Sequence, residues 1–600
     1  MQKYPTATRV YPEIPLAQTV VRLCEDMGIQ QIVISPGSRN APLTKGFTSH
    51  DFFETFSLID ERAAAFFALG LAQQKRKPVA VVCTSGSALL NYYPAVAEAF
   101  YSDIPLVIIS ADRLPHRIDI GDGQTIRQTE VFEPHLEDAG YLIPDVTHAT
   151  QTLLASPKQT LLPPSASEAA IQKKQQQIQE DNEAVIHRVL QTAITKQGPV
   201  HLNVPLEEPL YGTTEVALDL RAIAPAAKMP FSTNLKPFFQ QWAKTKRKLV
   251  LVGVLAPNAL NDEIIAHLAD DPSVLFLVEK TSNINHHHCI DAIDTLIAPI
   301  EQQEALLAAL QPELLVTFGG MVVSKKVKAF LRNHPPKHHW HIDEKKAYDT
   351  YYTLSDFIGC SPLHFFSALL KEQQEYTISD YHQLGYTQYT RHRLAGIDYL
   401  KKIPFSDLKA FELIFNRLPK QGQLQLANSS TIRYAQLFAL PKALEVYCNR
   451  GTSGIDGSTA TAMGAAWNKA LPTLLITGDL SFFYDANGLW HNYIREDFRI
   501  ILINNSGGGI FRILPGEKDT PDYDRYFETV HHRTAKQLCK DHNIRYTSAH
   551  SVWEVKRALA GFFRPSSRAK LLEIFTPRIE NDTVVLNYFS SMNTNPKKEK

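Results

Sequence analysis

The sequence predicts an α/β protein that is built from three doubly wound parallel-sheet domains. Its 600 residues are too many for one ordinary domain, because domains of roughly 150 residues are the norm and three or four are expected here. Short runs of β-branched residues alternate with helical patterns, which indicates parallel strands joined by crossover helices. These runs are apolar throughout, which indicates strands covered by helices on both faces.

The first domain is predicted over residues 1–210. A segment rich in alanine and leucine, 61–74, predicts one of its helices. The segment 156–181 is predicted to be a mobile surface excursion that runs into a polar helix, because it combines two prolines with a Gln/Lys-rich tract. The strands of this domain are predicted at 31–35, 79–83, 106–110 and 200–204.

A central α/β domain is predicted over residues 230–370 and a third over 405–600. The polar segment 371–404 lacks strand patterns, so it is expected to be a linker. The central strands are predicted at 248–252, 274–278 and 314–318. Those of the third domain are predicted at 424–427, 444–448, 473–477 and 500–503.

The composition argues against several classes of protein. Lys plus Arg and Asp plus Glu both number 62, so the formal net charge is zero, which disfavours a nucleic-acid binder or a membrane-surface protein. The six cysteines show no C-x-x-C spacing, which predicts neither a disulfide framework nor a zinc site. Without a signal-peptide pattern or an apolar run of about 20 residues, the chain is expected to be cytoplasmic, with no membrane insertion.

Polar residues follow two predicted strands of the third domain. One strand ends in Gly478-Asp479-Leu480-Ser481, and another ends in 504–509, with Asp479 and Asn505 separated by 26 positions (505 − 479). A carboxylate and an amide oxygen at adjacent strand ends can bind Mg²⁺ together with a backbone carbonyl, water and diphosphate oxygens. Each motif alone could be ordinary turn chemistry. Their combination resembles the thiamin-diphosphate (ThDP) motif.

A ThDP enzyme also needs a glutamate after a strand of a different α/β domain, to protonate the aminopyrimidine ring of the cofactor. Glu61, in Asp60-Glu61-Arg62, has that position at the start of the predicted helix. The alternative is that Glu61 only stabilises the helix N-terminus, which is worth about half a kcal/mol. The metal motif in the third domain favours the cofactor role.

Several longer motifs make the resemblance specific, and it extends from about residue 10 to about residue 580. The chain resembles the MenD family of ThDP-dependent enzymes, the 2-succinyl-5-enolpyruvyl-6-hydroxy-3-cyclohexene-1-carboxylate (SEPHCHC) synthases. The motifs are S-P-G-S-R-N-A-P-L at 35–43, D-E-R at 60–62, T-S-G-S-A at 84–88, A-D-R at 111–113, G-Q-T-I-R-Q at 123–128, and N-R-G-T-S-G-I-D-G at 449–457. Other ThDP enzymes share the metal motif but lack the first and the last of these.

The resemblance implies a transferase of menaquinone biosynthesis with three domains, pyrimidine-binding (Pyr), central and diphosphate-binding (PP). The family decarboxylates 2-oxoglutarate and adds the resulting succinyl-semialdehyde carbanion 1,4 to isochorismate, releasing CO₂. It also implies thiamin diphosphate, Mg²⁺ or Mn²⁺, no nucleic acid, and a homodimer or dimer of dimers. The alternatives are another ThDP-dependent 2-oxoacid decarboxylase or acetohydroxyacid-synthase-like carboligase, and a non-catalytic regulatory homologue.

The resemblance also implies roles for particular residues. Lys326 occupies a position where we expect arginine in the family. Its ammonium group cannot form the two parallel hydrogen bonds that a guanidinium makes with a carboxylate. Leu480 replaces the third glycine of the general G-D-G motif. The implied catalytic residues are Glu61, Arg39, Ser38, Arg113, Gln124, Arg433 and Arg450; the substrate-binding residues are Ser429, Lys325, Lys326, Ile510 and Phe511; the cofactor-binding residues are Glu61, Ile455, Gly478, Asp479, Leu480, Ser481, Asn505 and Gly507; and the metal ligands are Asp479, Asn505 and Gly507.

Three of these residues carry an open alternative. Ile455 is expected to be the aliphatic wedge beneath the cofactor, but it could be an ordinary core residue. Ile510 and Phe511 are expected to form an apolar wall, but they could simply pack a helix start. The run 286–288 consists of three histidines and is predicted to be a solvent-exposed loop, because no matching ligand cluster follows it.

Overall fold

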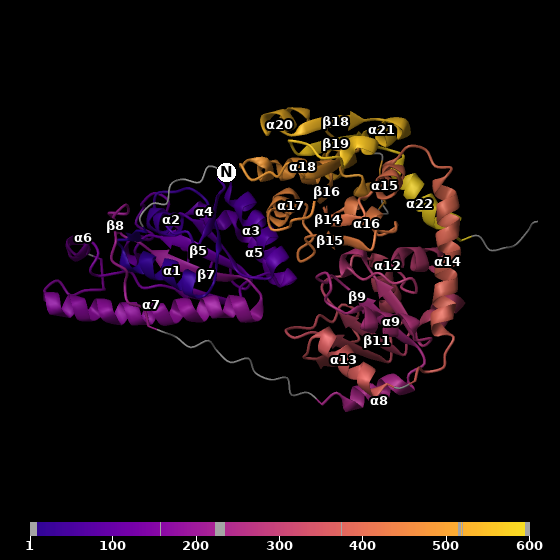
Figure 1. The fold of residues 1–600 in the computed structure, drawn as a ribbon, viewed down its shortest axis with the longest axis horizontal. Coiled ribbons are helices and arrows are strands. Elements are labelled where there is room, and N and C mark those ends of the chain that lie inside the picture. Colours follow the sequence, from indigo (N-terminus) through magenta and orange to yellow (C-terminus); the bar gives the residue numbers. More distant parts are fainter. Residues whose placement is uncertain are drawn as a thin grey trace, which may run out of the picture. The chain divides into compact units, whose positions relative to one another are not determined.

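The computed structural model describes residues 9–156, 158–221, 234–373, 375–513, 518 and 520–593, and its ribbon is drawn in Figure 1. This part of the chain contains three parallel sheets of six, five and six strands, which confirms the predicted fold class. The chain forms two compact units. One unit consists of Met1–Lys228, Asp456–Ala470 and Asp485–Arg495, and the other consists of the remaining residues. The predicted limits of the three domains stay predictions.

The first sheet has the strand order β3-β2-β4-β5-β7-β6, and each neighbouring pair is parallel. After β3 the chain returns to the other side of β2, so the loops after β2 and β4 meet where the strand order reverses. All four predicted strands are confirmed. The strands are β2 Gln31–Ile34, β3 Glu54–Ser57, β4 Val79–Cys83, β5 Leu106–Asp112, β6 Asp138–Tyr141 and β7 Val200–Pro205, beside a small ribbon of β1 Tyr11–Pro12 and β8 Thr213–Thr214.

Helices cover both faces of this sheet. Two of them, α1 and α7, share one apolar core with β2, β4, β5 and β7. The 29-residue α7 is the predicted polar helix, and the predicted mobility of the excursion before it stays a prediction. The helices of this unit are α1 Pro15–Asp26, α2 Ala41–Thr48, α3 Glu61–Lys75, α4 Ser87–Asn91, α5 Tyr93–Ser102, η1 Pro115–Arg117, α6 Thr150–Ala155, α7 Glu168–Lys196, α17 Ser458–Trp467 and η4 Ala486–Leu489.

Within the same unit, α17 crosses α3 with their backbones in contact. A Cβ added to Gly464 would lie 1.9 Å from the carbonyl oxygen of Phe67, and one added to Gly70 would lie 2.0 Å from that of Thr461. Only glycine fits at such a crossing, because any Cβ would overlap the opposite backbone. The crossing therefore fixes how α3, which begins at Glu61, lies against α17.

The central sheet has the order β10-β9-β11-β12-β13, and its first three predicted strands are confirmed. The strands are β9 Lys248–Val252, β10 Val274–Val278, β11 Leu314–Phe318, β12 His338–Ile342 and β13 Asp356–Ile358. The helices are α8 Lys236–Lys244, α9 Asp262–Asp270, η2 Lys280–Ser282, α10 Ile293–Ile297, η3 Ala298–Ile300, α11 Glu304–Leu310, α12 Lys325–Asn333 and α13 Pro362–Glu372.

The predicted linker, 371–404, contains a 20-residue helix, α14 Tyr381–Leu400. Gly385 of this helix lies against Leu275 of β10, and Gly396 lies against Tyr588 and Met592 near the C-terminal end of the described chain. In Figure 1 this helix runs along the central sheet and on to α22. It therefore ties the central sheet to the third sheet within one unit.

The third sheet has the order β15-β14-β16-β17-β19-β18. Its four predicted strands are confirmed, and β18 and β19 were not predicted. The strands are β14 Gln421–Leu426, β15 Ala443–Tyr447, β16 Thr473–Gly478, β17 Arg499–Asn504, β18 Arg545–Ala549 and β19 Lys570–Phe575. The helices are α15 Asp407–Phe415, α16 Ser430–Ala435, α18 Asp479–Tyr484, α19 Ile510–Ile513, η5 Tyr523–Phe527, α20 Lys536–Asp541, α21 Val552–Phe562 and α22 Asn581–Ser591.

All six cysteines are buried, and none of them forms a disulfide bond within the described residues. Among the described residues, no helix has both the length and the apolar character that crossing a membrane would require.

Candidate active site

The polar residues after β16 and β17 lie at one edge of the third sheet. These strands are parallel neighbours, with Gly478 paired to Ile503, so Asp479 and Asn505 emerge side by side. The strand order also reverses between β14 and β16, which is where open α/β sheets bind ligands. The two residues therefore follow neighbouring parallel strands, and their role as metal ligands stays a prediction.

The Asp479 carboxylate is buried and receives backbone hydrogen bonds on both oxygens. Leu480 N–H donates to Oδ1 at 2.7 Å, and Gly507 N–H donates to Oδ2 at 2.9 Å. His531 Nε2 lies 3.3 Å from the same Oδ2. The contact with Gly507 joins the two strand-end loops. His531 was missed from the sequence, since it follows no strand and belongs to no motif.

Asn505 is held by a buried carboxylate that the sequence analysis also missed. Its Nδ2 donates to Asp407 Oδ2 at 2.8 Å, which turns its Oδ1 away from Asp407. Thr576 Oγ1 donates to the other oxygen of Asp407 at 2.5 Å. Burial raises the pKa of Asp407 to about 6. Asp407 is the first residue of α15 and directly follows a serine at the N-cap. Its sequence context therefore indicated only a helix N-terminus.

The glycine loop after β17 leaves no space for a side chain at Gly507. Gly507 has φ +155°, and a Cβ there would lie 2.6 Å from the carbonyl oxygen of Glu528. Gly508 N–H donates to that same oxygen at 2.6 Å. A carboxylate, an amide oxygen and backbone carbonyls at one sheet edge are the oxygen donors that Mg²⁺ takes. The residues present therefore fit a divalent cation with diphosphate oxygens as its further ligands.

Two arginines of the same unit carry groups that suit an anion. Arg450, after β15, donates from Nη1 to Asn428 Oδ1 at 2.8 Å. Its buried Nε has no hydrogen-bond partner in the part of the chain that the structure describes. Burial lowers the pKa of Arg433 on α16, and the nearby charge of Arg450 lowers it further. A guanidinium with an unused buried donor can bind a carboxylate.

Buried carboxylates lie near these arginines. Glu279 accepts hydrogen bonds from Val323 N–H at 2.8 Å and Ser324 N–H at 2.9 Å. Burial raises the pKa of Glu279 to about 7, although the charge of Arg450 acts in the opposite direction. A carboxyl with that pKa is only partly ionised near neutral pH, so it balances the arginine charge incompletely.

The lysines predicted on α12 differ in their surroundings. Lys325 is exposed, while Lys326 Nζ pairs with Glu301 Oε2 at 2.7 Å. Lys328, which the sequence analysis missed, is half-buried, and burial and the charge of Arg450 lower its pKa. It stands three positions after Lys325 on the same helix, so helical spacing could have identified it.

Ser429 caps α16 in a conformation that is rare for a residue with a side chain. Its φ is +66° and its ψ is −129°. Such strain is typical of functional sites, where surrounding structure holds a residue in place. Ser429 directly follows Asn428, the partner of Arg450. The predicted substrate-binding residue Ser429 and the predicted catalytic residues Arg433 and Arg450 therefore belong to the segments that follow two neighbouring strands, β14 and β15.

Glu61 is the first residue of α3 in the other unit. The helix is capped by Asp60, whose Oδ1 accepts a hydrogen bond from Ala63 N–H at 2.9 Å. The other oxygen of Asp60, Oδ2, accepts one from Asn487 Nδ2 at 2.7 Å. Burial raises the pKa of Glu61, and the charge of Asp60 adds to this shift. Since Asp60 already caps the helix, the alternative that Glu61 serves only the helix end is weakened.

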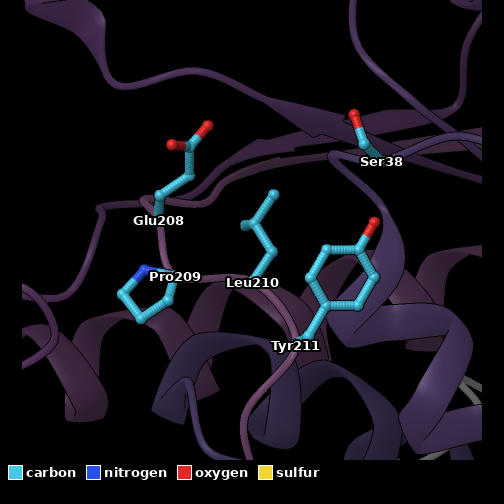
Figure 2. A pocket seen from close by; sticks show the side chains of 5 residues that line it. All are labelled: Ser38, Glu208, Pro209, Leu210 and Tyr211. Carbon is cyan, nitrogen blue, oxygen red and sulfur yellow. The ribbon is translucent and has the colours of Figure 1, made fainter.

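The S-P-G-S-R loop after β2 carries Ser38 and Arg39 in this same unit. Arg39 is 4% exposed, and it donates to Leu206 O and Glu208 Oε1, both at 3.0 Å. Its buried Nε is without a partner among the described residues. Exposed Ser38 lines a pocket of about 460 Å³ together with Glu208, Pro209, Leu210 and Tyr211. Figure 2 shows Glu208, Leu210 and Tyr211 extending toward the side on which Ser38 lies.

Arg113 and Gln124 belong to one loop system beside Arg39. Arg113 Nη2 donates to Gly123 O at 3.1 Å. Burial lowers the pKa of Arg39, and the charge of Arg113 lowers it further. Gln124 has φ +56°, and its backbone lies against Gly86, whose added Cβ would be 3.1 Å from Gln124 O. The structure thus brings four of the predicted residues, Ser38, Arg39, Arg113 and Gln124, to the loops at the reversal of the first sheet.

The predicted apolar residues are partly exposed. Ile455 is 37% exposed, which is inconsistent with an ordinary core isoleucine, and its carbonyl accepts from Ser481 Oγ at 2.6 Å. Phe511 is also 37% exposed, and its ring meets Phe527 edge to face. The short helix α19 that contains Ile510 and Phe511 is anchored by Arg512, whose Nη2 donates to buried Glu528 at 2.8 Å.

Comparison with known proteins gives two family matches. Residues 14–134 match the family described as "Thiamine pyrophosphate enzyme, N-terminal TPP binding domain", and residues 229–426 match "Middle domain of thiamine pyrophosphate". The solved structure of benzoylformate decarboxylase from Polynucleobacter necessarius is similar with a TM-score of 0.64 at 15% identity, over 94% of this chain and 98% of that one. At that identity the likeness shows the fold alone.

Several relatives are similar over nearly their whole length, and each is named 2-succinyl-5-enolpyruvyl-6-hydroxy-3-cyclohexene-1-carboxylate synthase. The protein of Christiangramia forsetii is 50% identical, over 97% of this chain and 99% of its own length. That of Flavobacterium johnsoniae is 46% identical, over 97% and 100%. That of Porphyromonas gingivalis is 36% identical, over 95% of each.

Proposed function

This chain belongs to the 2-succinyl-5-enolpyruvyl-6-hydroxy-3-cyclohexene-1-carboxylate synthase family, and from that premise we propose that it catalyses the SEPHCHC synthase reaction of menaquinone biosynthesis. The substrates would be 2-oxoglutarate and isochorismate, and CO₂ would be released. The family that the sequence motifs indicated is thereby confirmed. The observation that carries the proposed chemistry is the meeting of Asp479, Asn505 and Gly507 at one sheet edge.

The cofactors of this reaction would be thiamin diphosphate and Mg²⁺, or Mn²⁺ in its place. Asp479, Asn505 and the Gly507 carbonyl would hold the metal ion, and Gly478, Leu480 and Ser481 would line the diphosphate. When bound, ThDP would supply a thiazolium ring whose acidic C2 can act as a nucleophile and whose positive charge accepts the electron pair released by decarboxylation. The tight glycine loop supports this assignment, because Gly507 N–H donates to Asp479 Oδ2 and so holds that carboxylate against the loop that carries the Gly507 carbonyl.

Glu61 would hold the proton that activates the cofactor ring. Its carboxyl must be protonated to donate a hydrogen bond to a ring nitrogen, and burial raises its pKa in the direction that favours this form. Such a proton shuttle contributes typically about 10²–10⁴-fold to a rate. Ile455, partly exposed beside the Gly478–Ser481 loop, would support the cofactor from below as an aliphatic wedge.

The substrates together carry four carboxylate groups, so their site needs several cations. Arg433 and Arg450 in one unit, and Arg39 and Arg113 in the other, have the guanidinium fork that binds a carboxylate through two hydrogen bonds. The unpartnered Nε atoms of Arg39 and Arg450 support this role. Ser38, Gln124, Ser429, Lys325 and Lys326 would complete the polar lining, while Ile510 and Phe511 would form its apolar wall.

The assembly would be a homodimer or a dimer of dimers, with each cofactor bound by the first domain of one subunit and the third domain of another. We also infer a cytoplasmic setting, because six buried cysteines without a disulfide bond are typical of a reducing compartment.

The decisive assay compares two reactions of the purified chain with ThDP and Mg²⁺. SEPHCHC formation from 2-oxoglutarate and isochorismate is expected, and acetolactate formation from pyruvate is not. The reason is that pyruvate offers one carboxylate to a site lined by several cations. The D479A variant serves as the control that loses the metal ligand. Acetolactate as the main product would favour an acetohydroxyacid-synthase-like carboligase, and failure to bind ThDP would favour a non-catalytic homologue.

A further inference from the structure

The histidine run of the central domain lies in a loop, as predicted, but only His287 of its three residues is exposed. His286 and His288 are half-buried, and the fold brings Asp270, the last residue of α9, beside them. One side-chain ligand atom from each of these three residues lies within 4.8 Å of the other two. His288 Nδ1 is 2.7 Å from Asp270 Oδ1. No ligand cluster was expected after the run, and the third residue, Asp270, indeed precedes it and comes from a separate element.

The loop that carries these histidines is fixed by its backbone. Tyr386 Oη donates to the His287 carbonyl at 2.8 Å, and His382 Nε2 lies 3.3 Å from the His288 carbonyl. Both partners belong to α14, where their rings stack at 5.3 Å. Two residues further on, Ile290 continues the loop as a bridge to β10. The histidines are thus presented from a backbone that is already held in place, before any ligand binds.

From this arrangement we propose that Asp270, His286 and His288 form a binding site for one borderline divalent cation of the Zn²⁺ class. Two imidazole nitrogens and one carboxylate oxygen are a ligand set that zinc, nickel, cobalt and copper accept, and water would complete a tetrahedron. Mg²⁺ prefers oxygen ligands only, so this site would not compete for the ion held by Asp479 and Asn505.

The distances allow such an ion after small movements. Donor atoms around a tetrahedral zinc are about 3.3 Å apart, since each bond is about 2.0–2.1 Å long. The distance between His288 Nδ1 and Asp270 Oδ1, now 2.7 Å, must lengthen by roughly half an ångström to reach this value. The other ligand atoms lie within 4.8 Å of one another, so the widest pair must close by at most about 1.5 Å. Asp270 is exposed and its side chain can rotate, so the change does not require the backbone to move.

The ion would take the place of the proton that now joins His288 to Asp270. Metal binding requires neutral imidazole and releases protons. The carboxylate of Asp270 would offset part of the positive charge of the ion, whereas the positive charge of Lys442 would repel the ion. The bound ion would clip the end of α9 to the loop that rests on α14.

The test uses the full chain without a polyhistidine tag, saturated with Mg²⁺, and titrates Co²⁺ as a visible probe. One Co²⁺ per chain is expected, with the absorption bands of a tetrahedral site, and Zn²⁺ should displace it. D270N, H286A and H288A should each weaken binding by at least about 10-fold, since even residues that only orient ligands change affinity by that much. Zn²⁺ should raise the melting temperature of the parent and not of these variants.

The matched control is H287A, which removes the middle histidine of the same run but no member of the site. It should bind Co²⁺ as the parent does. Absence of stoichiometric binding in the parent would overturn the proposal, and so would an equal loss in H287A and H288A, because that result indicates unspecific binding to a histidine run. Circular dichroism of each metal-free variant checks that it folds. SEPHCHC formation should persist in H288A, so this test and that of the proposed function fail independently.

Discussion

Replacing Gly464 with alanine should force α3 and α17 apart. The added Cβ would lie 1.9 Å from the carbonyl oxygen of Phe67 and 2.8 Å from its carbonyl carbon, where ordinary contacts begin at 3.4 Å. The obstructing atoms belong to a helix backbone, so no side chain can rotate away. One helix must therefore move by more than an ångström, and α3 carries Glu61 at its first turn.

Two opposing terms set the size of the effect. Alanine favours a helix interior over glycine by about 1 kcal/mol. Overpacking of a tight contact typically costs about 1–3 kcal/mol, and a backbone overlap belongs at the upper end of that range. The difference is a net destabilisation of about 2 kcal/mol, which corresponds to a fall in melting temperature of about 4–8 °C for a unit of this size.

Gly561→Ala is the matched control, because Gly561 lies in helix α21 and nothing lies within 4 Å of its added Cβ. The same gain in helix propensity should then stabilise the chain by up to about 1 kcal/mol. Thermal unfolding of both variants gives the overall change, and hydrogen exchange of the α3 amides shows where it occurs. If G464A melts at or above the parent temperature, as G561A should, the backbone contact between α3 and α17 is not as described.

Four further changes test the site. Glu61→Gln should slow hydrogen–deuterium exchange at C2 of ThDP by at least about 10²-fold with the fold retained; equal exchange rates in variant and parent would contradict its role. Asp479→Ala should raise the Mg²⁺ concentration needed for ThDP binding by at least about tenfold, as measured by fluorescence titration, and an unchanged Mg²⁺ requirement would exclude Asp479 as a ligand. Arg433→Ala should raise the KM for a substrate by about 10–100-fold, the value of a lost charged hydrogen bond, and a collapse of ThDP affinity would instead assign Arg433 to the cofactor. Asp407→Ala frees the amide of Asn505 and should weaken Mg²⁺-dependent ThDP binding by about 10–100-fold; unchanged affinity would make Asp407 merely structural.

The sheets could be predicted because most of their strands are continuous apolar runs, such as VAVVC at β4 and RIILIN at β17. The strands that were missed lack this pattern or lie at an edge. β6 has the sequence DAGY, and β18, RYTSA, is largely exposed. Edge strands need less apolar surface, so hydrophobic pattern alone does not identify them. The helix α14 escaped prediction for a similar reason, since its apolar residues are spread around its circumference.

The sequence identified candidate site residues where an unusual polar residue directly follows a predicted strand, as Asp479 and Asn505 do. The groups that hold those residues were not found, and the reason is physical. Asp407 is 98 positions away from Asn505 in sequence, yet its carboxylate fixes which atom of the Asn505 amide faces the cation site. His531 approaches Asp479 from a segment that follows η5. Such supporting contacts depend on how loops cross in three dimensions, and no local pattern encodes them.

The neighbours of the histidine run also depend on the three-dimensional fold and could not be predicted from the sequence. Ligand spacing within one segment is the usual guide to a metal site, and three adjacent histidines offer none. The third ligand of the proposed site, Asp270, ends α9 and precedes β10 in the sequence, whereas the histidines follow β10. The fold brings these two segments together, although no sequence periodicity would pair them. For this reason a search for metal sites in parallel sheets must compare the segments before and after each strand, as well as the loops at the carboxyl edge.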